Sequence, residues 1–496
     1  MLNIYVFGVD LIYTHFGIYI FSRQNDQGPI PDSLIFHRKI SNTMRILTPL
    51  AIVATIVIFI VSNLSIGASV DIQVNGPDGS SIVKFPTVTD FSLGKTVGQM
   101  YDARVYSLMM LVLVFSGIWP YVKLIMMLVS WISPVSIISF EHRERLLIWL
   151  DALGKYSLVD SFVLVLMLVS FKFRLDFPGV GSIDSYVIPA CGFYLFLIGT
   201  VLSLVIGHGV TFLHRFTKLP KIQHSSLRES LCHHAFQVEN ANDTNDSPQF
   251  VKLSRAAHVA WAAITLFCIT LLSIGAMNKS FTFEFQGLTG VILGDDRRTS
   301  YSLITLGTSL PLSVEDPSSI GITCIQYTFF FFAFLMPLAC LCNITILYYV
   351  PMTLRSQQIV FMLAEITNAW SAVEVFLLSV MASMFELSRF AEFMVGDLCD
   401  FMKAQFFQDL FNGEDTCFSV KSTVGFGVIY LCIGVAMHNF VVFTGLRLAH
   451  HALEERMLRE EDGEENLTSK HDSTIAKAVR WKMTRFLVES TDGHEM

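Results

Sequence analysis

The chain has 496 residues, of which 52% are hydrophobic and only 15% are charged. Soluble domains carry about 25% charged residues, so this composition excludes a soluble globular protein and predicts one that a bilayer solvates. The formal net charge of −8 excludes the basic surface that nucleic-acid binding requires, and no nucleic-acid partner is expected.

The N-terminal segment, residues 1–45, begins with an apolar stretch that does not fit a secretory signal peptide. It carries Asp10 and has neither a basic start nor a small-residue cleavage site. An interfacial segment, an extra span and the remnant of a longer chain all stay open. We therefore assign residues 1–45 only as a cytosolic or interfacial segment.

Eight apolar runs are long enough to cross a bilayer, which takes about 20 residues of helix. Four of them fall in residues 46–213 and four in residues 256–448. In chain order the runs are Ile46–Ile66, Val105–Ile132, Tyr156–Phe173, Tyr186–Leu213, Ala256–Met277, Cys324–Val350, Ala369–Phe390 and Gly425–Leu448. The sequence therefore predicts an all-α polytopic membrane protein built from two tandem four-helix transmembrane modules.

A segment with strand periodicity follows the first helix of each module. Residues 68–104 hold two alternating stretches, VDIQV and SIVKF, on either side of the turn sequence NGPDG. Residues 278–323 begin with SFTFEFQG, which alternates in the same way. These patterns predict small β-hairpin insertions outside the membrane.

The two modules share an ordered series of residues. Ser157 and Ser371 are 214 residues apart, and the same offset relates Asp160 to Glu374. Such a series favours an internal repeat, and parallel repeats are one way to build a transporter. The two serines are expected to form local hydrogen bonds rather than to act as nucleophiles.

Asp160 and Glu374 are expected at matching depths near the starts of two apolar helices. An ionised carboxylate inside hydrocarbon costs several kcal/mol. Two interpretations stay open. The acids could anchor helix N-termini, where the helix dipole favours negative charge, or they could line a polar cavity or lock one helix to another.

The second predicted helix of each module contains a proline, and that of the first module also contains a lysine. Pro120 and Pro337, related by an offset of 217, are predicted to kink their helices. Lys123 follows Pro120 by three residues, and an ion pair with Asp160 would offset the desolvation of both groups. The same offset puts Cys340 at the lysine position, so the acid of the second module has no predicted cation.

Polar segments follow each module. Residues 214–255 are predicted as a polar cytosolic linker and residues 449–496 as a charged cytosolic tail. Apolar residues from Ile475 to Phe486 follow helical spacing beside basic residues. They predict an amphipathic helix on an anionic membrane surface, with a docking helix as the alternative. The distribution of lysine and arginine predicts that both termini are in the cytosol. It does not indicate which organelle's membrane contains the protein.

The cysteines do not form a metal-binding pattern, because no CxxC pair occurs. Cys340 and Cys342 lie in an apolar run and are expected to be buried. Cys399 and Cys417 flank a polar segment and could form a disulfide outside the cytosol. No metal site, cofactor or enzyme activity is predicted, since no P-loop, HExxH or GxSxG sequence is present.

The sequence ERLLIWLDALGKYSLVDSFVLVLMLV resembles the signature of the paraquat-inducible protein A family. The resemblance also extends to Pro120 and to the duplicated four-helix plan, and it is stronger over residues 40–215 than over 250–450. It implies an integral membrane protein that helps to move lipids or to keep membranes intact, with a lipid-shuttling partner of the MCE type. Bacterial members carry CxxC zinc ribbons, which this chain lacks, so zinc binding is not carried over.

Three functions are therefore expected. The first is transport of lipids or other amphiphiles between the bilayer and an extramembrane protein partner. The second is a non-transporting membrane scaffold or assembly factor. The third is a proton-coupled carrier of small molecules that uses Asp160 and Glu374 as proton sites. The resemblance further implies that the region of Lys123 and Asp160 matters to function.

Overall fold

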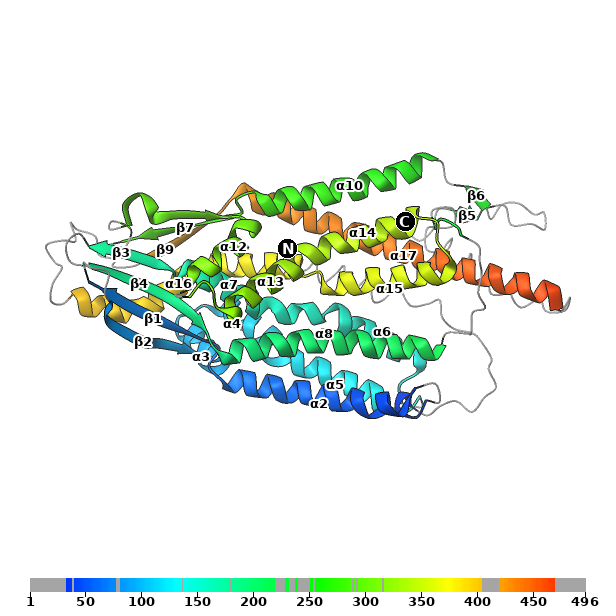
Figure 1. Cartoon of the computed structure of the whole chain (residues 1–496), viewed down its shortest axis with the longest axis horizontal. Coiled ribbons are helices and arrows are strands. Elements are labelled where there is room, and N and C mark those ends of the chain that lie inside the picture. The colour runs from blue at the N-terminus through cyan, green and yellow to red at the C-terminus, as the bar shows by residue number, and fades with distance from the viewer. Residues whose placement is uncertain are drawn as a thin grey trace, which may run out of the picture. The chain divides into compact units, whose positions relative to one another are not determined.

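The computed structural model describes a mostly helical chain with small β-sheets (Figure 1). The described residues are 33–37, 40–76, 81–135, 137–177, 181–218, 228–231, 237–239, 250–252, 255–287, 290, 293–314, 316–403 and 419–468. Within them, eight helical segments are long and apolar enough to cross a membrane. The predicted class, a polytopic α-helical membrane protein with small extramembrane strands, is confirmed.

The first four candidate spans fall within residues 42–215, and two of them are interrupted helices. Their elements are α2 (Asn42–Leu64); α4 (Tyr106–Val112), η2 (Leu113–Ile118) and α5 (Trp119–Ile132); α6 (Phe140–Ala152), η3 (Gly154–Leu158) and α7 (Val159–Ser170); and α8 (Cys191–Lys218). A short helix, α3 (Leu93–Asp102), precedes α4.

The last four candidate spans fall within residues 258–453. Their elements are α10 (Arg255–Met277); α13 (Ile320–Phe330), η6 (Phe331–Leu335) and α14 (Met336–Tyr349); α15 (Leu354–Trp370) and α16 (Val373–Lys403); and α17 (Phe426–Thr468). Three further short elements, η1 (Leu34–Phe36), α12 (Leu303–Ser309) and η5 (Pro311–Ser313), complete the described helices outside the sheets and the η4 turn (Gly294–Arg297).

The two interrupted helices α4–η2–α5 and α13–η6–α14 change pitch at a proline. The π-helical turn η2 ends just before Trp119 and Pro120, and η6 ends just before Met336 and Pro337. A proline lacks the backbone N–H and its ring crowds the preceding turn, which the wider π-helical turn accommodates. The structure thus puts the same irregularity at both predicted sites, while the bend itself stays a prediction.

A four-stranded antiparallel sheet lies at one end of α2 and α8 (Figure 1). Its order is β2 (Ser81–Phe91), β1 (Ala68–Asn75), β4 (Gly181–Pro189) and β3 (Phe173–Phe177). The β1–β2 hairpin is the one predicted for residues 68–104. The predicted start of the fourth helix at Tyr186 is wrong, because Tyr186 pairs with Asp71 in the sheet and the helix begins at Cys191.

A second, three-stranded sheet has the order β8 (Arg298–Tyr301), β7 (Phe281–Gln286) and β9 (Ser419–Val424). The strands β7 and β8 fall inside the predicted strand region, residues 278–323, whereas β9 comes from far along the chain. A small pair of strands, β5 (Gln237–Glu239) and β6 (Phe250–Lys252), occupies part of the predicted flexible linker.

The chain packs as two compact units. Unit 1 comprises Met1–Pro220, Ile269–Leu338 and Ile366–Met437, and unit 2 comprises Lys221–Cys268, Ala339–Glu365 and His438–Met496. Unit 1 therefore holds α7 and α16, which come from different halves of the sequence. The predicted division into modules at residues 46–213 and 256–448 stays a prediction.

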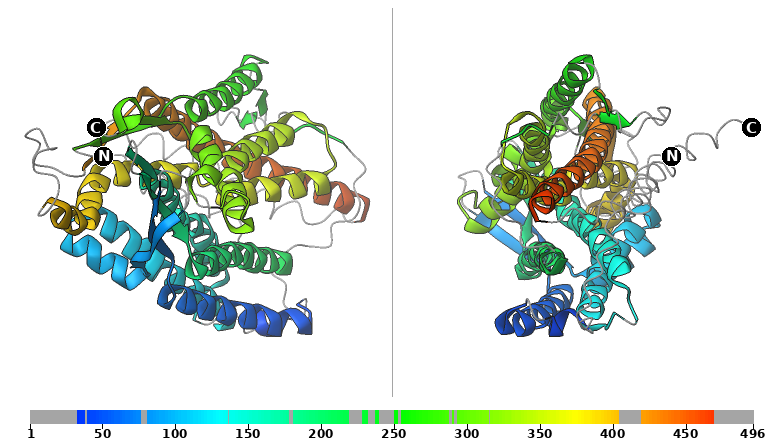
Figure 2. Two further views of the ribbon diagram at one scale, coloured as in Figure 1. Left: turned by 60° about the vertical axis from the view of Figure 1, so that its left-hand side comes forward. Right: turned by 90° about the vertical axis from the view of Figure 1, so that its right-hand side faces the viewer.

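Inside unit 1, α2 and α8 lie side by side, as both views in Figure 2 also show. Phe59 of α2 packs edge to face on Phe196 of α8, with ring centroids 5.5 Å apart. Leu147 and Leu150 of α6 join the same buried core. Helix α6 packs on α8 and α5 and leads through η3 into α7.

Inside unit 2, tyrosine and arginine side chains tie the helices through backbone carbonyls. Tyr348 Oη donates to the carbonyl of Gly445 at 2.7 Å. Tyr349 Oη donates to the carbonyl of His258, also at 2.7 Å. Arg456, which is buried, donates to the carbonyl of Met352 at 3.2 Å and to the side-chain oxygen Oε1 of Gln357 at 2.7 Å. Buried polar groups are satisfied in this way when water cannot reach them.

Several expectations fall on residues outside the described ranges. They are the apolar N-terminal stretch, the amphipathic tail helix at 475–486 and Cys417. The Cys399–Cys417 disulfide therefore stays a prediction. Of the two cysteines expected to be buried, Cys340 is buried but Cys342 is exposed, because it lies on the outward face of α14.

Candidate functional site

The two predicted acids occupy the same position along their helices, α7 and α16. Asp160 is the second residue of α7 and Glu374 is the second residue of α16. The two helices pack on each other in unit 1, where the rings of Phe162 and Phe376 meet edge to face at 5.8 Å. Placing these acids at helix N-termini is therefore correct, and the helix dipole favours their charge there.

Glu374 is buried and forms an ion pair with Lys155. Both side chains are about 5% exposed or less. The repeat offset predicts no cation for this acid. That prediction is wrong, because the partner Lys155 belongs to the η3 turn in the other half of the chain, and the offset relates Glu374 only to Asp160. Removing either member of such a buried ion pair destabilises the folded protein, because the other charge is left without compensation.

Lys123 is fully buried in α5, but Asp160 is not its partner. Its ammonium donates to the carbonyl of Ser203 on α8 at 3.3 Å and interacts electrostatically with Asp151. A Cβ added at Gly207 would lie 3.7 Å from Lys123 Nζ and 2.8 Å from Asp151 Oδ1, so the two charged groups flank that glycine. The predicted Lys123–Asp160 ion pair is wrong, because the acid that interacts with Lys123 is Asp151 of α6.

Asp151 also contacts His208 of α8, with 2.5 Å between Oδ2 and Nδ1. The His208 ring lies 6.0 Å, centroid to centroid, from that of Trp370, which ends α15 shortly before Glu374. We call Lys123, Asp151, Lys155, His208 and Glu374 the buried polar cluster. It joins the α5–α8 side of unit 1 to the start of α16.

The buried polar cluster keeps unused hydrogen-bonding capacity. Within the described part of the chain, Asp151 Oδ1, His208 Nε2 and Glu374 Oε2 have no hydrogen-bond partner. Unpaired buried polar atoms cost about 1–3 kcal/mol each and call for a functional explanation. Ser371 Oγ is also buried and unpaired, contrary to the local hydrogen bond expected for it, whereas Ser157 is simply buried in η3.

A cavity of about 80 Å³ lies beside Asp160 in unit 1. Asp160 is partly exposed there. It is the charged residue among the described side chains that line the cavity. The walls come from α2, α3, α4, α7 and α8 and from three strands of the first sheet, and are mainly apolar, with Val163, Leu164, Met167 and Phe196 among them.

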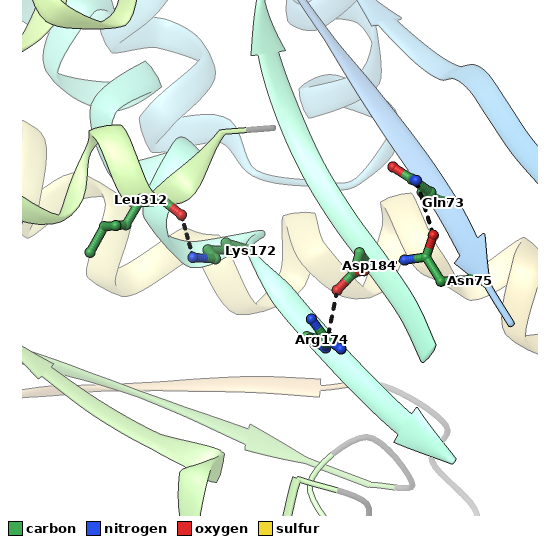
Figure 3. A network of polar contacts seen from close by, with 6 residues as sticks. All are labelled: Gln73, Asn75, Lys172, Arg174, Asp184 and Leu312. Atoms are coloured by element: carbon green, nitrogen blue, oxygen red, sulfur yellow. Dashed lines mark hydrogen bonds and ion pairs between the residues drawn. The ribbon is translucent and has the colours of Figure 1, made fainter. Parts of the chain in front are cut away.

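Polar contacts fix the strands that form part of these walls (Figure 3). Asp184 of β4 is buried, accepts a hydrogen bond from Asn75 Nδ2 at 2.7 Å and lies 3.7 Å from Arg174 Nε. Gln73 donates to Asn75 Oδ1 at 3.0 Å. The network thereby ties β1, β4 and β3 together across their register.

Lys172 adds a contact just after α7. Its ammonium donates to the backbone carbonyl of Leu312 (Figure 3). Partial burial lowers the pKa of Lys172 below its ordinary value, and the charge of Asp184 acts in the opposite direction. The lysine thus anchors the exit of α7 to the segment that holds Leu312.

The sequence patterns do not identify three members of the buried polar cluster as site residues: Asp151, Lys155 and His208. A signal existed for His208, which falls inside a predicted apolar run, where an ionisable residue is a functional candidate by default. Asp151 and Lys155 lie just before the predicted apolar run Tyr156–Phe173, where a charged residue needs no special explanation.

The fold and the site define a class: an integral, multi-pass α-helical membrane protein with ionisable groups buried among its helices. The family model described as "PqiA: Paraquat-inducible protein A" matches residues 318–402, so this part of the chain is similar to that family. The matched segment runs from α13 to α16 and includes Pro337 and Glu374. It lies in the half where the resemblance was expected to be weaker.

Two further comparisons gave no relatives. None of the curated proteins and none of the solved structures compared with the chain matches it.

Proposed function

We propose that this protein gives lipids or similar amphiphiles a path between the bilayer and its extramembrane side. The observation that supports this function is the cavity beside Asp160. Its lining combines residues of membrane-spanning helices, such as Leu164, with residues of the extramembrane strands, such as Val70 and Val187. An apolar wall outside the bilayer spares a hydrocarbon chain the exposure to water, which costs about 0.8 kcal/mol for each methylene.

The arrangement of the two halves supports the same proposal. A π-helical turn precedes a proline in each half, and an acid starts the equivalent helices α7 and α16. We infer that the halves are copies of one unit, the plan that many transporters use around a central site. The distribution of lysine and arginine supports the proposal that both termini are on the cytosolic side, which protease protection of terminal tags in sealed vesicles would test.

Filling the cavity tests the transport proposal. Leu164→Trp replaces an aliphatic side chain in the lining with a larger indole ring. Leu202→Trp on α8 makes the same change at an exposed position and serves as the matched control. Both variants would be reconstituted in proteoliposomes, and the transfer of a fluorescent phospholipid to acceptor vesicles would be measured. We expect a several-fold loss of rate for Leu164→Trp only. Equal rates for a correctly folded Leu164→Trp would contradict the proposal and favour a scaffold role.

A second candidate, a proton-coupled carrier, is supported by the buried polar cluster. Asp151 and His208 are residue types that take up and release protons, and both keep an unpaired buried atom. A pH gradient across the proteoliposomes would then drive transport in the wild type but not in His208→Gln. A wild type indifferent to the gradient would remove this candidate.

The lipid-shuttling protein partner is also part of the proposal. Purification of the full chain from native membranes after mild crosslinking would test it. An extramembrane lipid-binding protein recovered in constant ratio is the expected result, and its absence from the crosslinked complex would contradict this part.

A further inference from the structure

We propose that the cavity beside Asp160 selects amphiphiles whose headgroup carries a primary ammonium, as an ethanolamine phospholipid does. This inference deepens the proposed transport function and rests on it. Its starting point is a contrast between the two equivalent acids. Glu374 has a lysine ammonium beside it, whereas Asp160 has a cavity.

The chain itself offers no cation to Asp160 among its described residues. The two lysines buried nearby already have partners. Lys123 interacts with Ser203 and Asp151, and Lys155 forms an ion pair with Glu374. The remaining side chains that line the cavity are uncharged. A carboxylate in apolar surroundings is costly until an opposite charge meets it. A cationic group on the ligand would meet that need.

The equivalent site shows which kind of cation fits such an acid. Lys155 brings a primary ammonium to Glu374 at the start of α16, in a setting where both side chains are almost fully buried. A ligand ammonium at Asp160 would occupy the corresponding place at the start of α7. A primary ammonium has three N–H donors for the carboxylate, whereas a quaternary ammonium has none.

The rest of the cavity fits the remainder of such a molecule. Next to Asp160 on α7, its walls are formed by Val163, Leu164 and Met167, and Phe193 and Phe196 of α8 complete this apolar side. These side chains can bury the start of a hydrocarbon chain. The lone negative charge disfavours headgroups with a net negative charge, because like charges repel strongly where water is scarce.

The test is photo-labelling of the full-length protein in nanodiscs. Diazirine-bearing phosphatidylethanolamine, phosphatidylcholine and phosphatidylglycerol would be compared at equal mole fraction, and the labelled residues mapped by mass spectrometry. We expect the ethanolamine probe to label α7 around Leu164 several-fold more than the other two. Asp160→Asn should abolish that preference, and Asp102→Asn, an exposed acid on α3, should preserve it.

The outcomes separate this inference from the function on which it rests. Equal labelling of the cavity by all three lipids, or preference for the glycerol probe, would overturn the headgroup selectivity but leave the transport path intact. No labelling of the cavity by any probe would contradict both. Competition in the wild type by unlabelled phosphatidylethanolamine against phosphatidylcholine tests the same preference without any variant, should Asp160→Asn fail to fold.

Discussion

At the scale of single residues, a buried ion pair inside unit 1 connects segments that are far apart in the sequence. Lys155 and Glu374 come from opposite halves of the sequence and form one buried ion pair. Removing one member leaves the other charge buried without compensation, which costs far more than the pair contributes. The pair therefore holds the start of α16 against the η3 turn.

A double-mutant cycle on this pair tests that role. Glu374→Gln and Lys155→Met should each lower the free energy of unfolding by about 3–5 kcal/mol, because each strands a buried charge or leaves its partner unpaired. The double variant Lys155→Met/Glu374→Gln should lose far less than the sum of the two. Thermal unfolding in detergent would measure all three. Strictly additive losses would show that the two groups do not interact.

Two glycines of α8 offer a matched comparison beside the buried polar cluster. A Cβ at Gly207 would lie 2.8 Å from Asp151 Oδ1, whereas one at Gly209 has nothing within 4 Å. Gly209→Ala should raise helix stability by up to about 1 kcal/mol, and Gly207→Ala should lower protein stability by displacing the carboxylate. The measurement is again thermal unfolding, and the same sign for both variants would refute the proposed crowding.

At the scale of elements, the sheet network connects β1 and β4, two of the strands that line the cavity, with β3. Asp184→Ala removes the acceptor of Asn75 and the partner of Arg174, and should weaken the sheet by about 1–3 kcal/mol. Hydrogen exchange of β1, β3 and β4 should then become faster, while exchange in the second sheet stays unchanged. Asp102→Asn is the control, and uniform acceleration of both sheets would argue against a local network.

Lys172 predicts a pH dependence at the exit of α7. Burial lowers the pKa of its ammonium in the folded protein, so just below its ordinary value of 10.5 the unfolded chain binds more protons than the folded one. Stability should therefore gain a contribution as the pH rises through that window, and Lys172→Met should remove it. Unfolding midpoints between about pH 8 and 10.5 would show it, and an identical pH profile for the variant would disprove it.

The elements themselves differ in how far the sequence predicts them. The eight apolar helices follow from length and hydropathy alone, because a bilayer demands both. The hairpin β1–β2 follows from its turn and alternation. The strands β4 and β9 were missed, because each pairs with a strand far away in the sequence, and local periodicity carries no record of such a partner.

At the scale of the whole molecule, the candidate site was partly predictable. The predicted repeat offset correctly placed Asp160 and Glu374 at the starts of two apolar helices. The offset could not supply their partners, because those depend on contacts between segments far apart in the sequence. Lys155 pairs with Glu374, and Asp151 interacts with Lys123, the lysine predicted for Asp160. These contacts give the two acids different surroundings.

The measurement that tests the central claim most directly is crosslinking from inside the cavity in native membranes. A diazirine amino acid at position 164 would be activated in cells and its adducts identified by mass spectrometry, with position 202 as the lipid-facing control. The account predicts lipid adducts at position 164 that vanish when Val163→Trp fills the cavity, with unchanged adducts at position 202. Lipid adducts at position 202 alone would contradict it.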